Sequence, residues 1–593
     1  MKTNIIFSKV RNLAKAVLPF YLFTLLPLFS SCSDFLDDQV PQGTLNEEEV
    51  KNPAYVDNIL VSAYAGLVTI EDMNASFSLW NYDTRSDDAY VGGSDYSDGA
   101  PFHNLELATG VMTTDWPFSS IWTRFYQYLS RINFCLNVLS TADQSNADIQ
   151  ERIAEMQFLR AYGHFQLKRL FKKIPFVNKL GLTDDDIKEI SNTEYTNDQG
   201  WQQIINDLEY AYNHLPVTQV QKGRPTKAAA AAFLAKVYLY KAYRQDNDNN
   251  NQVTAVNEAD LQKVVEYTNP DIYTKAGYGL ESDLHNNFRP EEQYENGKES
   301  IWAIQYSRDD GTDYGNLNFS NRLIPPELEG ILGGCDFYKP SRNLVNAYVT
   351  DVEGHPTFTT SEEVYELGSA KTVDPRLFIT VGIPGTQFMF NPDAKFKIEA
   401  TRGWSRSGGN YGYFISLKQC VDPAWTGKYL INADNQWATS MNRIVFRYAD
   451  VLLMRAEALA QLGQTKDAII LVNQVRSRAK SMQSSSIVAN YSSTLNVHYN
   501  VKPYDGSYDK AEAMKIVKME RRLELAMESE RFFDLVRWGD AEKVINDFYL
   551  NESKSMKFIE GAHFTANKNE YLPIPHEQMA ASNGKYTQNC GNW

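Results

Sequence analysis

The sequence predicts a mostly α-helical protein, with a tetratricopeptide-like helical solenoid as its scaffold and a loop-rich, mixed α/β subdomain. Apolar residues recur at helical spacing from Trp201 to Tyr212, and Thr226–Tyr243 is dominated by alanine and other good helix formers. A second pair of periodic segments covers Ala449–Leu462 and Ala468–Ala479, with small residues where two helices would meet. This second pair has about the length of a tetratricopeptide repeat, and stacked helical pairs of that kind build solenoids.

The helical periodicity is lost in the middle of the chain. Between about Gly277 and Asn442, glycine, proline and aromatic residues separate short apolar runs, and Ser300–Tyr306 has strand-like residues. This part is too aromatic to be disordered. We therefore expect an N-terminal helical part over 46–276, an irregular region over 277–442, and a C-terminal helical part with an extended tail over 443–593. Further helices are expected at 53–68, 119–139, 148–171, 512–528 and 531–548.

The first 31 residues, 1–31, predict a secretory signal peptide. Four basic residues precede an apolar run from Ala16 to Leu28, which is shorter than the roughly 20 apolar residues of a membrane-spanning helix. Phe29-Ser30-Ser31-Cys32 resembles a bacterial lipobox, although Phe29 replaces the usual aliphatic residue. We expect lipidation at Cys32 and a lipidated tether over 32–45. The alternative is an ordinary secretory signal with an incidental cysteine.

Composition excludes one class of partner. The formal net charge is -16, and removal of the four basic residues of the signal leaves the mature chain still more acidic. Because nucleic-acid binding requires a basic face, we expect no nucleic-acid partner. The cysteines other than Cys32 lie far apart without CxxC spacing, which favours buried thiols over disulfides. They are Cys135, Cys335, Cys420 and Cys590.

Four motifs stand in a fixed order along the chain. They are Cys32 with Asp34-Phe35-Leu36-Asp37; Trp122–Asn137 followed by Glu155–Phe171; Tyr448–Ala458 with Glu520–Leu525 and Glu530–Gly539; and Tyr571–Pro575 with Gln588-Asn589. Together they resemble the SusD/RagB family of outer-membrane nutrient-binding lipoproteins of Bacteroidetes, and the third motif is the most specific. The tail departs from the family pattern, with Cys590 where proline is usual. The alternating charges of the third motif can pair at helical distances, so we interpret them as scaffold residues.

The resemblance implies a protein that captures oligo- or polysaccharide and delivers it to a SusC-like TonB-dependent outer-membrane transporter. It would be lipid-anchored in the outer membrane through Cys32 and face the cell surface, with the region 277–442 binding the ligand. RagB-like members of the family handle peptides instead, so peptide capture is the alternative.

No dedicated catalytic motif accompanies this pattern. The sequence has no GxSxG, GxxxxGK[ST] or GxGxxG, and His576-Glu577 lacks the second histidine of HExxH. We therefore expect a binding protein and not an enzyme. A glycosidase is the third hypothesis, because carboxylates are abundant and a catalytic pair needs only two of them.

Glycan capture requires exposed aromatic faces for the sugar rings and nearby polar side chains for the hydroxyl groups. Two loop-rich regions have this mixture, one after the first helix and one in the middle of the chain. The choice of residues comes from composition and place, and a packing role is the alternative for each aromatic residue. The predicted ligand-binding residues are Trp80, Asp87, Asp88, Tyr90, Phe102, Tyr314, Phe337, Trp404 and Tyr411.

The stretch Asp83–Asp88 is also a candidate calcium loop, because it holds three aspartates. The alternative is an ordinary solvated acidic loop. We expect no metal as a fixed component and no other cofactor.

Overall fold

The computed structural model describes residues 55–71, 79–246, 250–308, 310–311, 315–328, 331–357, 363–433 and 436–593. The chain divides into two compact units, Met1–Ile59 and Leu60–Trp593. The predicted signal peptide, Cys32 and the tether lie outside the described residues. Helix α4 (Val56–Glu71) takes up part of the helix expected at 53–68, and the elements after it all belong to the second unit.

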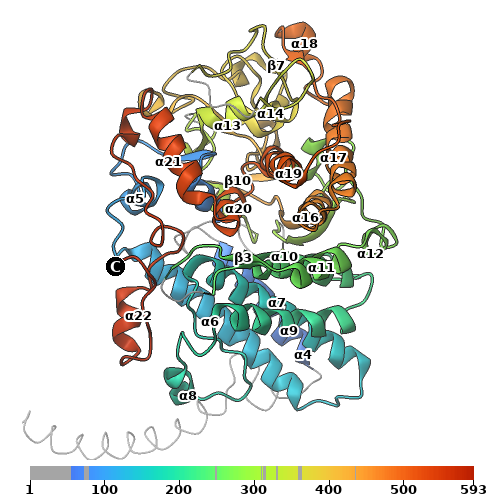
Figure 1. Cartoon of the computed structure of the whole chain (residues 1–593), viewed down its shortest axis with the longest axis vertical. Coiled ribbons are helices and arrows are strands. Elements are labelled where there is room, and N and C mark those ends of the chain that lie inside the picture. The colour runs from blue at the N-terminus through green and yellow to red at the C-terminus, as the bar shows by residue number, and fades with distance from the viewer. Residues whose placement is uncertain are drawn as a thin grey trace, which may run out of the picture. The chain divides into compact units, whose positions relative to one another are not determined.

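Successive antiparallel helices build the N-terminal part of this second unit, in the lower half of Figure 1. Each helix packs against the next in order, and the packing continues from α10 and α11 onto α16 of the C-terminal part. The predicted helices at 119–139 and 148–171 are confirmed, as is the pair around Trp201 and Thr226. The bounds are α6 (Trp116–Ser140), α7 (Ala147–Phe171), α9 (Asn197–His214), α10 (Lys227–Ala242) and α11 (Glu258–Tyr267).

Small residues and polar caps explain why these helices form and pack closely. Thr196 and Gln199 form a capping box at the start of α9, and the Thr226 hydroxyl accepts a hydrogen bond from the amide of Ala229 at 3.3 Å. The alanines at the start of α10 are fully buried, which lets neighbouring helices approach. A Cβ on Gly163 of α7 would lie 2.8 Å from Leu129 of α6, so these two helices meet at a position without a side chain.

The C-terminal part is also built from helices. One of them differs from the prediction. The segment expected as one helix over 531–548 is two helices, because Gly539 takes a left-handed conformation (φ 75°) and ends α20. Hydrophobic periodicity continues across this break, so the pattern did not reveal it. The bounds are α16 (Tyr448–Gln461), α17 (Thr465–Ser485), α19 (Lys510–Leu525), α20 (Arg531–Trp538) and α21 (Ala541–Glu552).

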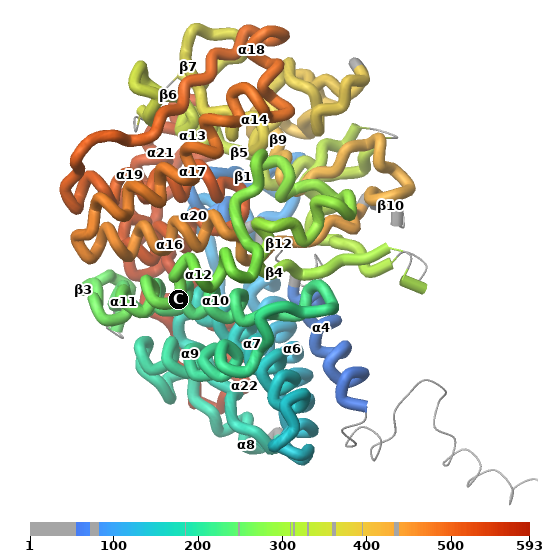
Figure 2. The backbone as a smooth tube through the Cα atoms, turned by 90° about the vertical axis from the view of Figure 1, so that its right-hand side faces the viewer, coloured from blue at the N-terminus to red at the C-terminus, as the bar shows by residue number. Residues whose placement is uncertain are grey.

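The middle of the chain forms short strands in small sheets. The strand expected near Ser300–Tyr306 is confirmed as β4 (Ser300–Ile304), and it pairs antiparallel with β12 (Arg443–Arg447), beside which it lies in Figure 2. The other pairs are β1 (Ala89–Gly92) with β5 (Phe337–Pro340), β10 (Leu430–Ala433) with β11 (Gln436–Thr439), β8 (Val381–Gly382) with β9 (Ile415–Ser416), β2 (Tyr243–Arg244) with β3 (Ala255–Val256), and β7 (Thr372–Val373) between β6 (Val349–Thr350) and β13 (His498–Tyr499).

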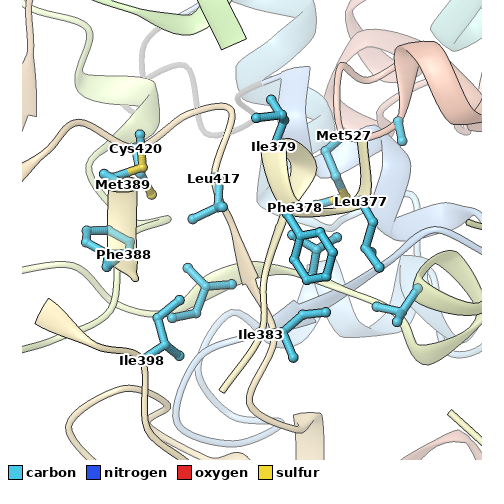
Figure 3. Close-up of a cluster of buried hydrophobic side chains, with 14 of the residues drawn as sticks. Leu377, Phe378, Ile379, Ile383, Phe388, Met389, Ile398, Leu417, Cys420 and Met527 are labelled. Atoms are coloured by element: carbon cyan, nitrogen blue, oxygen red, sulfur yellow. The ribbon is translucent and has the colours of Figure 1, made fainter. Parts of the chain in front are cut away.

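Short helices connect these strands over a large apolar core. Figure 3 shows part of this core, where Leu377, Phe378 and Ile379 of one short helix meet Met527 from the C-terminal part. The short α-helices are α5 (Ala100–Glu106), α8 (Asp184–Glu189), α12 (Pro270–Thr274), α13 (Arg342–Ala347), α14 (Arg376–Thr380), α15 (Gly408–Tyr411), α18 (Tyr491–Thr494) and α22 (His576–Ala581). The 3-10 helices are η4 (Leu79–Arg85), η5 (Leu284–Phe288), η6 (Phe319–Asn321), η7 (Phe388–Phe390), η8 (Ala394–Phe396), η9 (Pro423–Trp425) and η10 (Lys557–Ile559).

Buried ion pairs join the middle of the chain to the C-terminal helices. Glu524 of α19 accepts hydrogen bonds from Arg376 at 2.9 Å and Arg447 at 2.6 Å, and it also pairs with Arg478. Burial alone would raise the pKa of Glu524, but attraction to these guanidinium groups outweighs it and holds the pKa well below its ordinary value. The scaffold interpretation of the charged motif is therefore confirmed.

Other motif residues also tie elements together. Arg160 of α7 donates to Asp207 of α9 at 2.8 Å and to Asn133 of α6 at 3.1 Å. In the tail, the Asn589 amide donates to the carbonyls of Phe171 at 2.6 Å and Leu572 at 2.7 Å. These contacts stabilise the helical scaffold, and the departure at Cys590 leaves them intact. Cys135 and Cys420 are buried, as expected, whereas Cys335 and Cys590 are only partly buried.

Candidate ligand-binding surface

The two predicted aspartates are structural. Asp87 pairs with Arg531 at 2.9 Å, and Asp88 pairs with Arg522 at 2.6 Å; both carboxylates are buried. Burial alone would raise the pKa of Asp87, but the two arginines outweigh it and lower the pKa to about 2. These pairs fasten the segment after η4 to α19 and α20, so the expectation that they face a ligand is corrected.

The carboxylates of this stretch do not fit a calcium ion. Asp83 accepts hydrogen bonds from the Tyr338 hydroxyl at 2.7 Å and from the backbone amide of Ser529 at 2.8 Å, while Asp87 and Asp88 are paired with arginines. Calcium requires several oxygen ligands that can turn towards it. Among the described residues, no group of three His, Cys, Asp or Glu side chains could hold a metal ion.

Four predicted aromatic residues pack in the interior. The Tyr90 hydroxyl donates to Glu552, and Phe337 lies against the backbone of Gly93. Trp404 packs edge to face on Phe388, with ring centroids 5.5 Å apart, and Tyr411 stacks on His103 at 5.7 Å. All four are buried, so none presents a ring face to solvent, contrary to expectation. The partners of Tyr90, Phe337 and Tyr411 lie far away in the sequence, whereas Phe388 is close to Trp404. The packing role that was the alternative describes all four positions.

The remaining predicted aromatics lie nearer the surface or outside the described part. Phe102 is half-buried and packs edge to face against Trp116 at 5.9 Å, and Trp116 is 54% exposed. The backbone of Trp80 belongs to η4, but its side chain lies outside the described residues, as does all of Tyr314. Ligand binding by Trp80 and Tyr314 stays a prediction.

The structure instead brings an aromatic pair together on the turn between η9 and β10. Trp425 and Tyr429 pack edge to face, with ring centroids 5.3 Å apart and an angle of 69° between the planes. Both side chains are partly exposed. The ammonium of Lys428 lies 5.0 Å from the Trp425 ring and 4.8 Å from the Tyr429 ring. We call these three residues the aromatic turn.

Backbone and side-chain contacts hold the aromatic turn in place. Asp422 caps η9 by accepting from the amide of Ala424 at 2.8 Å, and it also accepts from the side chain of Asn391 at 2.8 Å. Arg308 reaches the turn from another segment and donates to the carbonyl of Lys428 at 2.7 Å. The rings are therefore presented by a turn that is fixed at two ends.

Described residues on both sides of positions 312–314 are held near this turn. The amide of Ser307 donates to the carbonyl of Asn316 at 2.9 Å. The amide of Asn318 then donates to the carbonyl of Thr439 at 2.7 Å, at the end of β11. The described residues that flank Tyr314 in the sequence are thus anchored to the hairpin that follows the aromatic turn.

A polar cavity of about 70 Å³ adjoins the base of the same hairpin. The carbonyl of Tyr429 accepts from the amide of Ser440 at 3.1 Å, and the residues directly after Ser440 line the cavity. Burial lowers the pKa of Arg443 to about 10. The lining includes several amide side chains, and an amide can both donate to and accept from hydroxyl groups. These side chains belong to Asn287, Asn318, Asn321, Gln419 and Asn442.

Sequence reasoning missed the aromatic turn, although a signal was present. Trp425 and Tyr429 are four residues apart, which is a helical spacing, but Gly427 between them favours a turn. Two aromatic residues that flank a Thr-Gly-Lys turn would have been the pattern to select. The predicted residues Trp404 and Tyr411 also lie close to glycines in the sequence, but their rings are buried in the structure.

Comparison with models of known protein families shows which family the chain belongs to. A family model described as "SusD family" matches residues 298–593, and one described as "Starch-binding associating with outer membrane" matches residues 34–239. The chain belongs to the SusD family. The resemblance seen in the four motifs is therefore confirmed, and it extends over most of the chain.

Individual relatives cover this SusD-family chain almost completely. SusD-like protein P2 of Formosa agariphila is 26% identical over 583 residues, which are 96% of this chain and 98% of the relative. A structure of a laminarin-binding SusD-like protein has a TM-score of 0.66 at 22% identity and covers 91% of this chain and 99% of that one. Surface glycan-binding protein A from Bacteroides thetaiotaomicron, solved in complex with laminarihexaose, has a TM-score of 0.63 at 21% identity, with 91% and 99% covered. The mostly helical fold is confirmed.

Within the described residues of this SusD-family chain, no helix combines the length and the apolar character needed to cross a membrane.

Proposed function

We propose that the protein is a non-catalytic glycan-binding lipoprotein that captures an oligo- or polysaccharide on the aromatic turn. The observation that carries the proposal is the pair of partly exposed rings, Trp425 and Tyr429, which pack edge to face on one turn. The amide of Ser440, directly before residues that line a cavity, donates to the carbonyl of Tyr429. The glycan-binding relatives support the same class of ligand. The captured glycan would pass to a SusC-like TonB-dependent transporter, and lipid on Cys32 would hold the protein at the cell surface in the outer membrane.

The chemistry of the aromatic turn suits a sugar. A pyranose ring offers an apolar face of C–H groups that can lie on Trp425 or Tyr429, and its rim of hydroxyl groups needs donors and acceptors. Amides of the adjoining cavity and the cations Arg308 and Lys428 supply these groups. Because the site is shallow and buries little area, we expect modest affinity, which surface anchoring offsets through a high local concentration.

Affinity electrophoresis of the mature chain through gels that contain soluble polysaccharides tests the proposal. Retardation by one glycan class, abolished in the Trp425→Ala/Tyr429→Ala variant, is the expected result. Phe134→Ala is the matched control, because it removes an exposed aromatic ring from helix α6. Unchanged retardation of the double variant would exclude the aromatic turn. Binding of peptides with no retardation by any glycan would favour peptide capture instead.

A further inference from the structure

A second cavity lies where the loop between α9 and α10 meets β4. Its volume is about 240 Å³, larger than the cavity beside the aromatic turn, and no residue lines both. Pockets that bury drug-sized ligands measure roughly 300–1,000 Å³, so this cavity suits a ligand no larger than a small sugar. We call it the β4 cavity; it includes Gln219, Lys222, Arg224, Tyr278, Asn296, Lys298 and Ser300 in its wall.

The β4 cavity is basic although the protein is acidic, with a formal net charge of -16. Of the described residues that line it, none carries a carboxylate, while Lys222, Arg224 and Lys298 carry positive charges. Arg224 is neutralised by Glu155, which accepts two hydrogen bonds from it at 2.9 and 3.0 Å. Within the described residues, neither lysine forms an ion pair. Lys222 and Lys298 therefore add positive charge to the wall of the cavity, and both residues are exposed.

A buried hydroxyl in the wall of this cavity also lacks a partner. Ser300 is 8% exposed, and its Oγ makes no hydrogen bond within the described part of the chain. A buried hydroxyl without a partner costs free energy. The Oγ atom itself is closed to solvent, so a ligand in the cavity would bond with it only after rotation about the Cα–Cβ bond of Ser300. The Tyr278 hydroxyl, also in the wall, makes only long contacts, 3.5 Å to Thr226 and 3.4 Å to the carbonyl of Ile301.

The wall that carries Lys222 is rigid. The indole N–H of Trp302 donates to the carbonyl of Gly223 at 2.9 Å, and the Arg224 guanidinium donates to Gln221 at 2.6 Å. Gly223 has a φ of 89°, and a Cβ there would lie 2.3 Å from Gln305, so only glycine fits the loop. Lys298 follows Asn296, whose amide exchanges two hydrogen bonds with Gln305 at 2.9 and 3.0 Å.

We propose that the β4 cavity is a second binding site, which takes a single anionic sugar unit such as a uronic acid. Its carboxylate would pair with Lys222 and Lys298, and its hydroxyl groups would bond with Ser300, with the Tyr278 hydroxyl and with the side-chain carbonyl oxygen of Gln219. The site differs from the aromatic turn in chemistry, because charge and hydroxyl recognition replace ring stacking. The inference does not depend on the proposed role of the aromatic turn.

Titration calorimetry of the mature chain at low ionic strength with D-glucuronic acid, D-glucose and sodium sulfate tests the site. We expect D-glucuronic acid to bind at least about tenfold more tightly than the other two. The Lys222→Gln/Lys298→Gln variant should weaken this binding by at least about tenfold, because it removes both cations. The matched control is Lys480→Gln/Lys510→Gln, which removes the same charge from exposed positions that line no described cavity. The control should bind as the unmodified protein does.

Ser300→Ala separates a binding role from a structural one. Removal of an unpartnered buried hydroxyl should leave the melting temperature unchanged or higher, while affinity for D-glucuronic acid falls by about threefold. Equal binding of D-glucose, equal binding of sulfate, or full binding by the double lysine variant would each overturn the assignment. The Trp425→Ala/Tyr429→Ala variant should keep its affinity for D-glucuronic acid, so failure of one site is distinguishable from failure of the other.

Discussion

The hydroxyl of Tyr338 donates a hydrogen bond of 2.7 Å to the carboxylate of Asp83, and both side chains are buried. The two residues are 255 positions apart, so this bond joins the segment after the first helix to β5. The backbone amides of Ser529 and Arg531 donate to the same carboxylate, at 2.8 and 3.1 Å. Asp83 thus connects η4 with β5 and with the segment that leads into α20.

This arrangement predicts a pH-dependent contribution to stability. Burial, with repulsion from Asp88 as a smaller cause, raises the pKa of Asp83 to about 7, from an ordinary value of 3.8. Between these values the folded protein binds more protons than the unfolded chain, so the contribution of Asp83 to the free energy of unfolding falls as the pH rises from about 4 to 7. The contribution is constant outside this window.

Urea unfolding at several pH values between 4 and 8 measures this slope. Asp83→Asn should make the free energy of unfolding fall less steeply with pH. The substitution can also change stability by an amount that is the same at every pH, and this does not affect the slope. Asp547→Asn, which alters an exposed partner of Lys543, should leave the slope between pH 5 and 7 unchanged. Equal slopes in the Asp83 variant and the unmodified protein would show that Asp83 is ionised throughout.

The buried ion pairs of α19 predict a large loss of stability on removal of one partner. Glu524→Ala would leave Arg376, Arg447 and Arg478 without a shared carboxylate in the interior. Breaking a buried pair from one side costs about 3–5 kcal/mol in the free energy of unfolding. Denaturation monitored by circular dichroism measures it, with Asp547→Ala as an exposed control that should cost less than about 1 kcal/mol. A loss as small as that of the control would contradict the scaffold role.

The loop beside the β4 cavity predicts a sharp difference between two glycines. Gly223→Ala should destabilise the fold by roughly 1–3 kcal/mol, because a left-handed residue acquires a Cβ that meets Gln305. Gly409→Ala, in α15, places its Cβ in open space and should change stability by less than about 1 kcal/mol. Thermal unfolding of both variants compares them directly. Similar melting temperatures would mean that the loop can relax around a side chain.

The aromatic turn predicts that ring shape, more than the tyrosine hydroxyl, determines affinity for glycan. Tyr429→Phe should keep affinity within about threefold, whereas Tyr429→Ala should lose about tenfold, because only the second removes the stacking face. Isothermal titration with the retarding polysaccharide measures both. If phenylalanine and alanine were equally harmful, the hydroxyl would be the recognition element and the stacking mechanism would be wrong.

The lipid anchor predicts a change of location. Cys32→Ala removes the acylated side chain, so the protein should move from the membrane fraction to the soluble fraction and lose labelling by a fatty-acid analogue. Fractionation and labelling of cells that express both forms measure this. Retention of the label in the variant would exclude Cys32 as the acylated residue.

Periodic patterns predicted the helices well because burial of one face repeats along them. The pair α16 and α17 matched the expectation, since small residues and Gly463 mark both the contact and the turn. The break at Gly539 was missed, because apolar residues on either side keep the helical spacing and only the backbone conformation differs. A single glycine within a strong pattern carries too little information to decide between a kink and a tolerated helix residue.

The candidate site was predicted less well, for a physical reason. Whether a ring faces solvent depends on what packs against it, and such partners can be distant in sequence. Tyr411 stacks on His103, more than 300 positions away, and Trp404 is buried with Phe388. Composition pointed to aromatic residues in loop-rich regions, but it could not distinguish these buried rings from Trp425, which is partly exposed.

Trp302 gives the β4 cavity an optical reporter. Its ring is 2% exposed and packs against Phe158 at 4.9 Å, while its indole N–H donates to a carbonyl in the cavity wall. An indole in such surroundings emits at shorter wavelengths than one in water, and its emission responds to nearby charges. Arrival of an anion between two ammonium groups would alter the field at this ring. A change in the fluorescence emission of Trp302 would therefore report binding of a ligand in the cavity.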